Sequence, residues 1–446
     1  MNLKSTIEIP EDVKFILRVL NSAGYQAFIV GGCVRDSIMG RVPGDWDITT
    51  NAKPREVKFL FSRTIDTGIK HGTVTVVVNG TNYEVTTYRI EGQYIDSRHP
   101  ESVEFTSSLK MDLARRDFTI NSIAYHPEEG FVDPFGGIND IGARIIRAVG
   151  NPQERFREDA LRMLRAVRFS AQLDFTIEHA TFMAIKENNS LILNISSERI
   201  RDEITKTLTS PHPEKVLLLR ELEMLEKIIP EFDACFGIEQ NNPYHVYNLV
   251  EHTINAVAAV EKDPVLRWTM LLHDTGKVDT KTTDEKKIDH FYEHQAKSAM
   301  LAEDVLKRLK FDNKTIDRVC RLIKHHDRYI ESTEKAVRKA VNVVGEDIFI
   351  ELLKVKEADV SAQNPKNIET GIAHINEIKH LYEEIKRKGQ CLSLKDLALN
   401  GDDLIKLGFT PGKNIGEALE NLLEQVIETP ELNEREKLVN LITYKN

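Results

Sequence analysis

The sequence predicts an α/β head with a mixed β-sheet and helices, followed by an elongated all-α region. Three observations lead to this prediction. The first 150 residues contain β-branched runs separated by turns, which is typical of strands joined by hairpins. Later segments repeat apolar residues with the 3.6-residue period of amphipathic helices. A chain of 446 residues also exceeds the usual size of one hydrophobic core, so we expect several domains.

The head is expected to begin with a helix over residues 11–24 and a strand, QAFIV. Two β-branched segments follow, at residues 72–78 and 83–90. The turn Asn79-Gly80 between them is a strong hairpin signal, because both central positions of a type I′ turn need positive φ.

The remaining two-thirds of the chain is predicted to be helical. Three segments carry the clearest helical pattern, at residues 158–173, 215–229 and 296–310. Breakers at Pro243, Asn364-Pro365 and Gly389-Gln390 indicate junctions. We expect four parts: a head (1–150), a helical neck (151–240), a helical body (241–365) and a helical tail (366–446).

Composition limits the class of protein. No long apolar run is present and the N-terminus lacks an apolar signal core, so we expect a cytoplasmic protein. The four cysteines are far apart and form no C-x-x-C pair, which argues against a thiolate zinc site or a disulfide framework.

The charge of the chain is uneven. A formal net charge of −10 argues against general affinity for nucleic acid. Between residues 144 and 168, however, seven arginines accompany only three acids, and we expect this basic stretch to contact any bound RNA. The seven are Arg144, Arg147, Arg155, Arg157, Arg162, Arg165 and Arg168.

The segment GDWDITTN places Asp45 and Asp47 one residue apart. In a strand they lie on the same face, with roughly 6 to 7 Å between their Cα atoms. Two such carboxylates hold divalent cations, and Mg²⁺ suits hard oxygen ligands. We therefore predict a phosphoryl-transfer site with Asp45 and Asp47 as catalytic metal ligands; the alternative is an ordinary turn.

Upstream, the motif VGGCVRD follows a strand and precedes a helical segment. Glycines such as Gly32 let backbone N–H groups approach a phosphate, and Arg35 adds a forked cation. The motif is neither a Walker loop nor G-x-G-x-x-G. Alone, the two glycines would indicate only a turn.

Four motifs in this order, GGCVRDSIMGRVPGDWDITT, LARRDFTINSIAY, DPFGGINDI and EDALRMLRAVRF, resemble those of class II tRNA nucleotidyltransferases, the CCA-adding enzymes of the polymerase-β-like superfamily. The resemblance implies a nucleotidyltransferase head in which Asp45 and Asp47 hold the catalytic metals. It also implies that Gly32, Arg35 and Arg116 contact the nucleotide. Asp117 and Asn121 match the same R-R-D motif, on the sugar side of the pocket.

The spacing Glu158-Asp159-x-x-Arg162 predicts base selection. Three residues apart on a helix, Asp159 and Arg162 present an acceptor beside a donor fork. Cytosine and adenine offer an amino donor next to a ring-nitrogen acceptor, so the pair complements C and A but opposes G and U. The alternative is an intrahelical salt bridge. We expect Arg165 to contact base or phosphate, and Arg168 to be a phosphate contact or a structural partner.

The family resemblance leaves one specificity open, namely full CCA addition or addition of the terminal A alone. Residues 86–105 are expected to form a mobile loop, or else a surface hairpin. A similar loop in the family is associated with adding the terminal adenosine, which favours CCA or A addition.

The body contains a second constellation, LLHDTGK with His273 and Asp274, joined by His252, His294, His326 and Asp359 in helical contexts. The pattern resembles an HD phosphohydrolase domain over residues 241–365. The resemblance implies that His252, His273, Asp274 and Asp359 hold a transition metal (Mn, Ni, Fe or Zn). His290 and His325 are not assigned as ligands, and whether this domain is active stays open.

Our leading hypothesis is therefore a tRNA nucleotidyltransferase that uses CTP and ATP with Mg²⁺, binds the tRNA acceptor arm and 3′ end, and has no membrane partner. A homodimer is possible in principle. The rival is a bacterial poly(A) polymerase, which shares the head but usually carries a basic C-terminal extension. A phosphohydrolase with a regulatory head and a noncatalytic RNA-binding protein are further alternatives. In the tail, Lys413 is either an RNA contact or an ordinary loop lysine.

Overall fold

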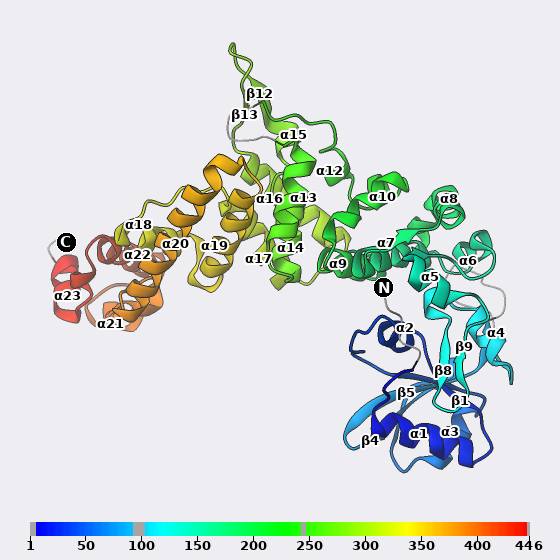
Figure 1. The fold of residues 1–446 in the computed structure, drawn as a ribbon. Helices are drawn as coiled ribbons and strands as arrows, with labels where there is room; N and C mark the ends of the chain where they lie inside the picture. Colours follow the sequence, from blue (N-terminus) through cyan, green and yellow to red (C-terminus); the bar gives the residue numbers. More distant parts are fainter. Residues whose placement is uncertain (1–5, 92–102, 242–246, 444–446) are drawn as a thin grey trace. The chain divides into compact units, whose positions relative to one another are not determined.

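A computed structural model describes residues 6–91, 103–241 and 247–443 of the chain. The chain divides into two compact units, Met1–Ile228 and Ile229–Asn446. The first contains the sheet and its helices, and the second is almost wholly helical (Figure 1), which confirms the predicted fold class. Within the described ranges, no helix is long and apolar enough to cross a membrane.

A seven-stranded sheet organises the head, in the order β3-β4-β5-β2-β1-β8-β9. β2 and β5 run parallel, whereas the other neighbouring pairs are antiparallel, so the sheet is mixed. Its strands are β1 (Ala27–Val30), β2 (Asp47–Thr50), β3 (Thr64–Gly68), β4 (Thr73–Val78), β5 (Thr81–Thr87), β8 (Ala124–His126) and β9 (Gly130–Val132).

The predicted hairpin joins β4 to β5. Asn79 has φ 48° and Gly80 has φ 82°, as a type I′ turn requires. The expected strand over 83–90 is wrong at its end, because β5 stops at Thr87 and β6 (Arg89–Glu91) pairs with β7 (Val103–Phe105) in a separate ribbon. Residues 92–102 of the predicted loop lie outside the described part of the chain.

The helices of the first unit flank the sheet and continue beyond it. The predicted first helix is α1, which buries Val13, Ile16, Leu17 and Leu20 at helical spacing. The helices are α1 (Glu11–Ser22), α2 (Gly32–Ile38), α3 (Pro54–Leu60), α4 (Leu109–Ala114), α5 (Gly137–Ala143), α6 (Pro152–Glu158), α7 (Leu161–Leu173), α8 (His179–Glu187), α9 (Ser197–Leu208), α10 (Leu218–Glu221) and α11 (Leu225–Ile228).

Two predicted helices of this unit are interrupted. The helix expected over 158–173 begins only at Leu161, because Asp159 adopts an extended conformation (φ −137°, ψ 102°) between α6 and α7. The segment 215–229 forms a 3₁₀ turn and two short helices, with a break at Glu223 (φ 58°). The apolar periodicity continues across both breaks, because the short helical segments on either side of each break still bury one face.

The second unit is built mainly from helices, and α16 confirms the helix predicted over 296–310. Asn364 accepts a hydrogen bond as the N-cap of α20, and Pro365 is its first residue. The elements are α12 (Pro230–Asp233), α13 (Leu249–Ala259), α14 (Pro264–Leu272), α15 (Lys277–Thr280), β12 (Lys281–Thr283), β13 (Asp289–Phe291), α16 (His294–Arg308), α17 (Asn313–His325), α18 (Glu334–Val344), α19 (Glu346–Ser361), α20 (Pro365–Arg387), α21 (Gly401–Lys406), α22 (Lys413–Glu428) and α23 (Arg435–Thr443).

Candidate active site

Three carboxylates gather at the start of β2. Asp47 is the first residue of the strand, whereas Asp45 is exposed in the preceding loop, so the expectation that both lie within one strand is wrong. Burial, and next the nearby charge of Asp45, raise the pKa of Asp47 to about 6. Glu84 of β5 stands opposite Asp47 in the parallel register and also raises this pKa. Sequence reasoning missed Glu84, because a parallel pairing leaves no local sequence signal.

The glycine motif forms the turn from β1 into α2. Gly31 has φ 84°, which favours glycine, and it is the N-cap of α2. A Cβ atom at Gly31 would lie 3.2 Å from Arg116 Nη1 and 3.9 Å from Asp47 Oδ2. The backbone of this turn therefore runs close to both the acidic site and the R-R-D motif. Gly32 begins α2 at the same place.

A buried polar network connects the predicted nucleotide-binding residues. Arg35 Nη1 donates to Asn121 Oδ1 at 2.7 Å, and Asn121 Nδ2 donates to Asp117 Oδ1 at 3.2 Å. Arg165 Nε in turn donates to Asp117 Oδ2 at 2.7 Å. Burial favours a higher pKa for Asp117, but Arg165 and Asn121 outweigh it and lower the pKa to about 2. The network thus keeps the buried Asp117 carboxylate ionised beside Arg165, with Arg35 linked to it through Asn121.

Asp159 and Arg162, which the spacing placed on one helix, lie in different elements. Asp159 Oδ2 lies 3.2 Å from Arg199 Nη2 of α9. Arg162 Nη1 instead donates to Glu158 Oε2 at 2.7 Å, and its Nη2 donates to the Arg115 carbonyl at 2.9 Å. The expectation failed because it assumed one continuous helix, whereas Asp159 lies in the break before α7.

Most of the predicted basic stretch is neutralised locally. Arg168 forms a buried ion pair with Glu203 at 2.8 Å, which agrees with a structural partner. Arg157 is exposed, and the described residues give it no acidic partner. The other pairs are Arg144 with Asp174, Arg147 with Asp140, Arg155 with Glu158, Arg162 with Glu158, and Arg165 with Asp117.

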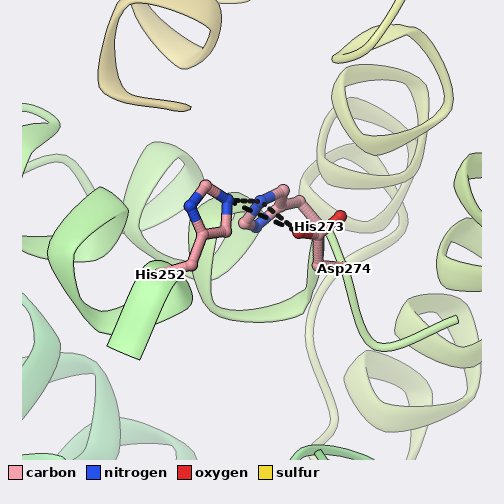
Figure 2. A group of neighbouring side chains, drawn as sticks. All are labelled: His252, His273 and Asp274. Atoms are coloured by element: carbon pink, nitrogen blue, oxygen red, sulfur yellow. Dashed lines mark hydrogen bonds and ion pairs between the residues drawn. The ribbon is translucent and has the colours of Figure 1, made fainter. Parts of the chain in front are cut away.

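In the second unit, all four predicted body ligands come together in a buried cluster. His252 Nε2 lies 3.0 Å from Asp359 Oδ1 and 3.5 Å from Asp274 Oδ2. His273 Nε2 lies 3.2 Å from Asp274 Oδ2 and 3.3 Å from His252 Nε2 (Figure 2). These three side chains place one ligand atom each within 4.8 Å of one another. The donor set fits a transition metal.

Two further histidines belong to this cluster. His294 Nε2 and His326 Nε2 approach Asp274 Oδ1, at 3.3 and 3.7 Å. The close approach of α16 requires Gly276, because a Cβ there would lie 2.5 Å from the His294 carbonyl oxygen. His290 and His325, which sequence reasoning left unassigned, are not part of either group of candidate ligands among the described residues.

Comparison with known proteins tests the class of protein that the sequence motifs predict. Residues 27–147 match the Poly A polymerase head domain family, and residues 281–442 match tRNA nucleotidyltransferase domain 2. The chain is 35% identical to the CCA-adding enzyme of Ligilactobacillus salivarius, over 97% of this chain and 96% of that protein. It is 37% identical to the CCA-adding enzyme of Bacillus velezensis, over 92% of each.

A solved structure agrees over the same length. The chain matches the crystal structure of Bacillus stearothermophilus CCA-adding enzyme in complex with CTP, with a TM-score of 0.73 and 30% identity, over 98% of this chain and 97% of that one. The fold and its acidic site therefore define a tRNA nucleotidyltransferase. The chain belongs to the family of CCA-adding enzymes, whose activity implies a divalent metal ion. This full-length similarity favours the leading hypothesis over a poly(A) polymerase.

Proposed function

We propose that this enzyme adds the complete CCA end to tRNA, using CTP and then ATP. The 3′ oxygen of the RNA attacks the α-phosphate, the bond to the β-phosphate oxygen breaks, and pyrophosphate leaves while the hydroxyl loses its proton. The observation that carries the proposal is the proximity of Asp45, Asp47 and Glu84 in a head with full-length similarity to CCA-adding enzymes.

We propose that Mg²⁺ is the divalent ion of the head. The donor set fits, because carboxylate oxygens are the ligands that Mg²⁺ prefers, and the charge of Asp45 already acts on Asp47. Asp45 and Asp47 would hold it, with Glu84 as a third acid at the same edge. When bound, Mg²⁺ neutralises phosphate charge and lowers the pKa of the attacking hydroxyl.

For the nucleotide, the network described above supports distinct roles. Gly32, Arg35 and Arg116 would contact the triphosphate, and Asp117 and Asn121 would position the sugar. Arg162 and Asp159 would select the base, with Arg199 holding Asp159 and Glu158 holding Arg162. Arg165 would support the pocket through Asp117.

For the RNA, we propose that exposed cations of the neck bind phosphates of the acceptor arm, with Arg157 as the leading candidate. The division into parts at 1–150, 151–240, 241–365 and 366–446, a cytoplasmic location and a homodimer stay predictions. Sedimentation of the purified chain tests the last of these.

One assay tests the specificity directly. Transcripts of tRNA that end before CCA, after C and after CC are each offered CTP, ATP or both. The proposal expects CTP to extend the first two and ATP to complete the third. An enzyme that extends only the transcript ending in CC would be restricted to the terminal A.

A second function is favoured by the buried cluster of the second unit. We propose that His252, His273, Asp274 and Asp359 hold a transition metal for phosphoester hydrolysis, as in an HD domain. Phosphatase activity with Ni²⁺ or Mn²⁺ should survive Asp45→Ala and disappear in His273→Ala. Metal-dependent activity that persists in His273→Ala would contradict this assignment.

A further inference from the structure

Three arginines surround an aromatic ring beside the proposed nucleotide site. The ring belongs to Phe169 of α7, and this residue is only 5% exposed. The guanidinium carbon of Arg168 lies 4.4 Å from the ring centroid, and those of Arg35 and Arg165 lie 5.3 Å from it. A cation within about 6 Å of a ring centroid is attracted by the negative face of the ring, most strongly where water is excluded. The ring therefore attracts all three cations.

Each of these arginines also has an acidic partner, and the pairs are Arg35 with Asp36 at 2.9 Å, Arg165 with Asp117 at 2.6 Å, and Arg168 with Glu203 at 2.8 Å. The three cations still act on one another. Burial, and next the charge of Arg165, lower the pKa of Arg168 to about 10, and the charge of Arg35 lowers it further. An aromatic ring attracts a cation without neutralising it, so the Phe169 ring offsets this repulsion and leaves the positive charge available to an anion.

Arg35 lies against the glycine turn between β1 and α2. A Cβ atom at Gly32 would lie 3.7 Å from Arg35 Nη2. Arg35 Nε and Nη2 donate to Asp36, at 2.9 and 3.0 Å, and Nη1 donates to Asn121 at 2.7 Å. Among the described residues, these bonds use three of the five N–H groups of the guanidinium, so two remain for phosphate oxygens.

We propose that Phe169 is a positioning residue for nucleotide addition, and that its ring holds the Arg35 guanidinium where the triphosphate of CTP or ATP binds. This inference rests on the proposed role of Arg35 at the triphosphate. It adds a residue with no charged or hydrogen-bonding side chain, which sequence reasoning did not assign. The positive charge is then in place before the nucleotide arrives, so the site need not reorganise during the reaction.

Phe169 also connects two parts of the site. It lies on α7, which begins just after Asp159 and carries Arg162, whereas Arg35 lies on α2 of the head. The Phe169 ring packs edge to face against Phe118, the residue that follows the R-R-D motif, with centroids 5.9 Å apart and planes at 83°. The ring is therefore held from the head as well as from α7, and its position near Arg35 does not depend on α7 alone.

Fluorination of the ring tests this role, because fluorine withdraws electron density from the ring face and hardly changes the shape of the side chain. Phe169 is replaced in the full chain by phenylalanine with one, two or three ring fluorines, through suppression of a stop codon. On a transcript lacking CCA, we expect the KM for CTP to rise with each fluorine, to about tenfold with three, at nearly constant kcat. The same series at Phe349, a buried phenylalanine of the second unit that packs against Tyr382, should leave the KM unchanged.

Inorganic tripolyphosphate shows whether the ring acts on the phosphate site. This ion lacks base and sugar, so its inhibition constant against CTP should rise by the same factor as the KM. The KM for ATP, on a transcript ending in CC, should rise equally, and the preference for CTP over UTP should not change, because all these nucleotides share the triphosphate. A changed base preference with unchanged tripolyphosphate binding would overturn the proposal.

The Arg35→Met background assigns the effect to one arginine. In this background the KM for CTP should be raised in every form and should no longer depend on fluorination of Phe169. A KM that still rises with fluorination would overturn the role of Arg35, because the ring would then act through Arg165 or Arg168. Circular dichroism checks that each form is folded.

Two further outcomes separate this inference from the proposed function. An active parent chain whose KM for CTP is the same with every fluorinated Phe169 would overturn the role of the ring and leave the proposed function standing. A folded parent chain that incorporates neither CTP nor ATP would instead overturn the proposed function, and the role of Phe169 with it.

Discussion

Asp47 of β2 lies directly opposite Glu84 of β5, in the parallel pair at the centre of the head sheet. Residues paired in this way project from the same face, so two acidic side chains share one edge with Asp45 close by. Burial, and next the charge of Asp45, make ionisation of Asp47 unfavourable and raise its pKa to about 6, and the charge of Glu84 adds to this cost. A bound cation would remove it.

Substitution of Asp45, Asp47 or Glu84 is expected to lower the activity to different extents. Asp45→Ala or Asp47→Ala should abolish incorporation of labelled CTP and ATP, because each removes a metal ligand. Glu84→Gln should lower it by roughly 10 to 100-fold, as expected for a supporting carboxylate. Glu128→Gln, at an exposed position after β8, is the control. Normal incorporation by both aspartate variants, with the fold intact, would refute the assigned site.

Mg²⁺ binding should depend on pH through Asp47. Its folded pKa of about 6 exceeds the ordinary aspartate value, so protonation favours the folded state and this stabilisation is lost as pH rises through 6. Mg²⁺ binds the ionised form, so the rise in Tm caused by Mg²⁺ should grow between pH 5 and 7.5. Differential scanning fluorimetry measures it. The same pH trend in Asp47→Asn would show that another group is responsible.

Base selection should change with the donor pattern at residue 159. Asp159→Asn introduces an amide N–H₂ that can donate to the carbonyl of uracil. One hydrogen bond to a charged group contributes about 1.5–3 kcal/mol, so the preference for CTP over UTP should fall by roughly 10 to 150-fold. Arg199→Ala should cause a smaller fall, because it only positions Asp159.

The matched control for this experiment is Asp202→Asn, which alters an exposed aspartate on the same helix as Arg199. Competition between CTP and UTP on a transcript lacking CCA gives the ratio. An unchanged ratio in Asp159→Asn would exclude this residue from base recognition.

Arg168 is expected to stabilise the folded chain rather than to contact the nucleotide. Its ion pair with Glu203 is buried on both sides, so Arg168→Met should destabilise the chain by about 3–5 kcal/mol by leaving Glu203 unpaired. The double variant Arg168→Met/Glu203→Leu should recover most of this loss. Urea denaturation measures both. A phosphate contact would instead raise the KM for CTP in Arg168→Met and in the double variant alike.

Binding of tRNA should weaken with salt, but less steeply than seven arginines would suggest. Six of the seven have acidic partners, so they release few counterions on binding. Arg157→Ala should lower the salt slope by about 1, whereas Arg144→Ala should change it less. Filter binding at salt concentrations from about 50 to about 200 mM measures this slope. Equal slopes for Arg157→Ala and the wild type would exclude this contact.

Local patterns were sufficient for much of the fold. The Asn79-Gly80 turn, the apolar face of α1 and the helix at α16 each depend on residues a few positions apart, and each was predicted. Where periodicity continued across a backbone break, as at Asp159 and Glu223, the prediction of one helix was wrong. The reason is that amphipathic spacing reports which face is buried, whereas a single extended or left-handed residue is enough to end a helix.

The sequence alone determined the residue types of both sites: the Asp45-x-Asp47 acids, the glycine turn, the R-R-D motif and the histidines around Asp274. Only the tertiary structure decided which of them meet. Glu84 reaches Asp47 through a parallel strand pairing, Arg199 reaches Asp159 from another helix, and the Ala362 carbonyl oxygen contacts the His252 ring from a distant helix end. Such contacts join residues far apart in the chain, and no local spacing encodes them.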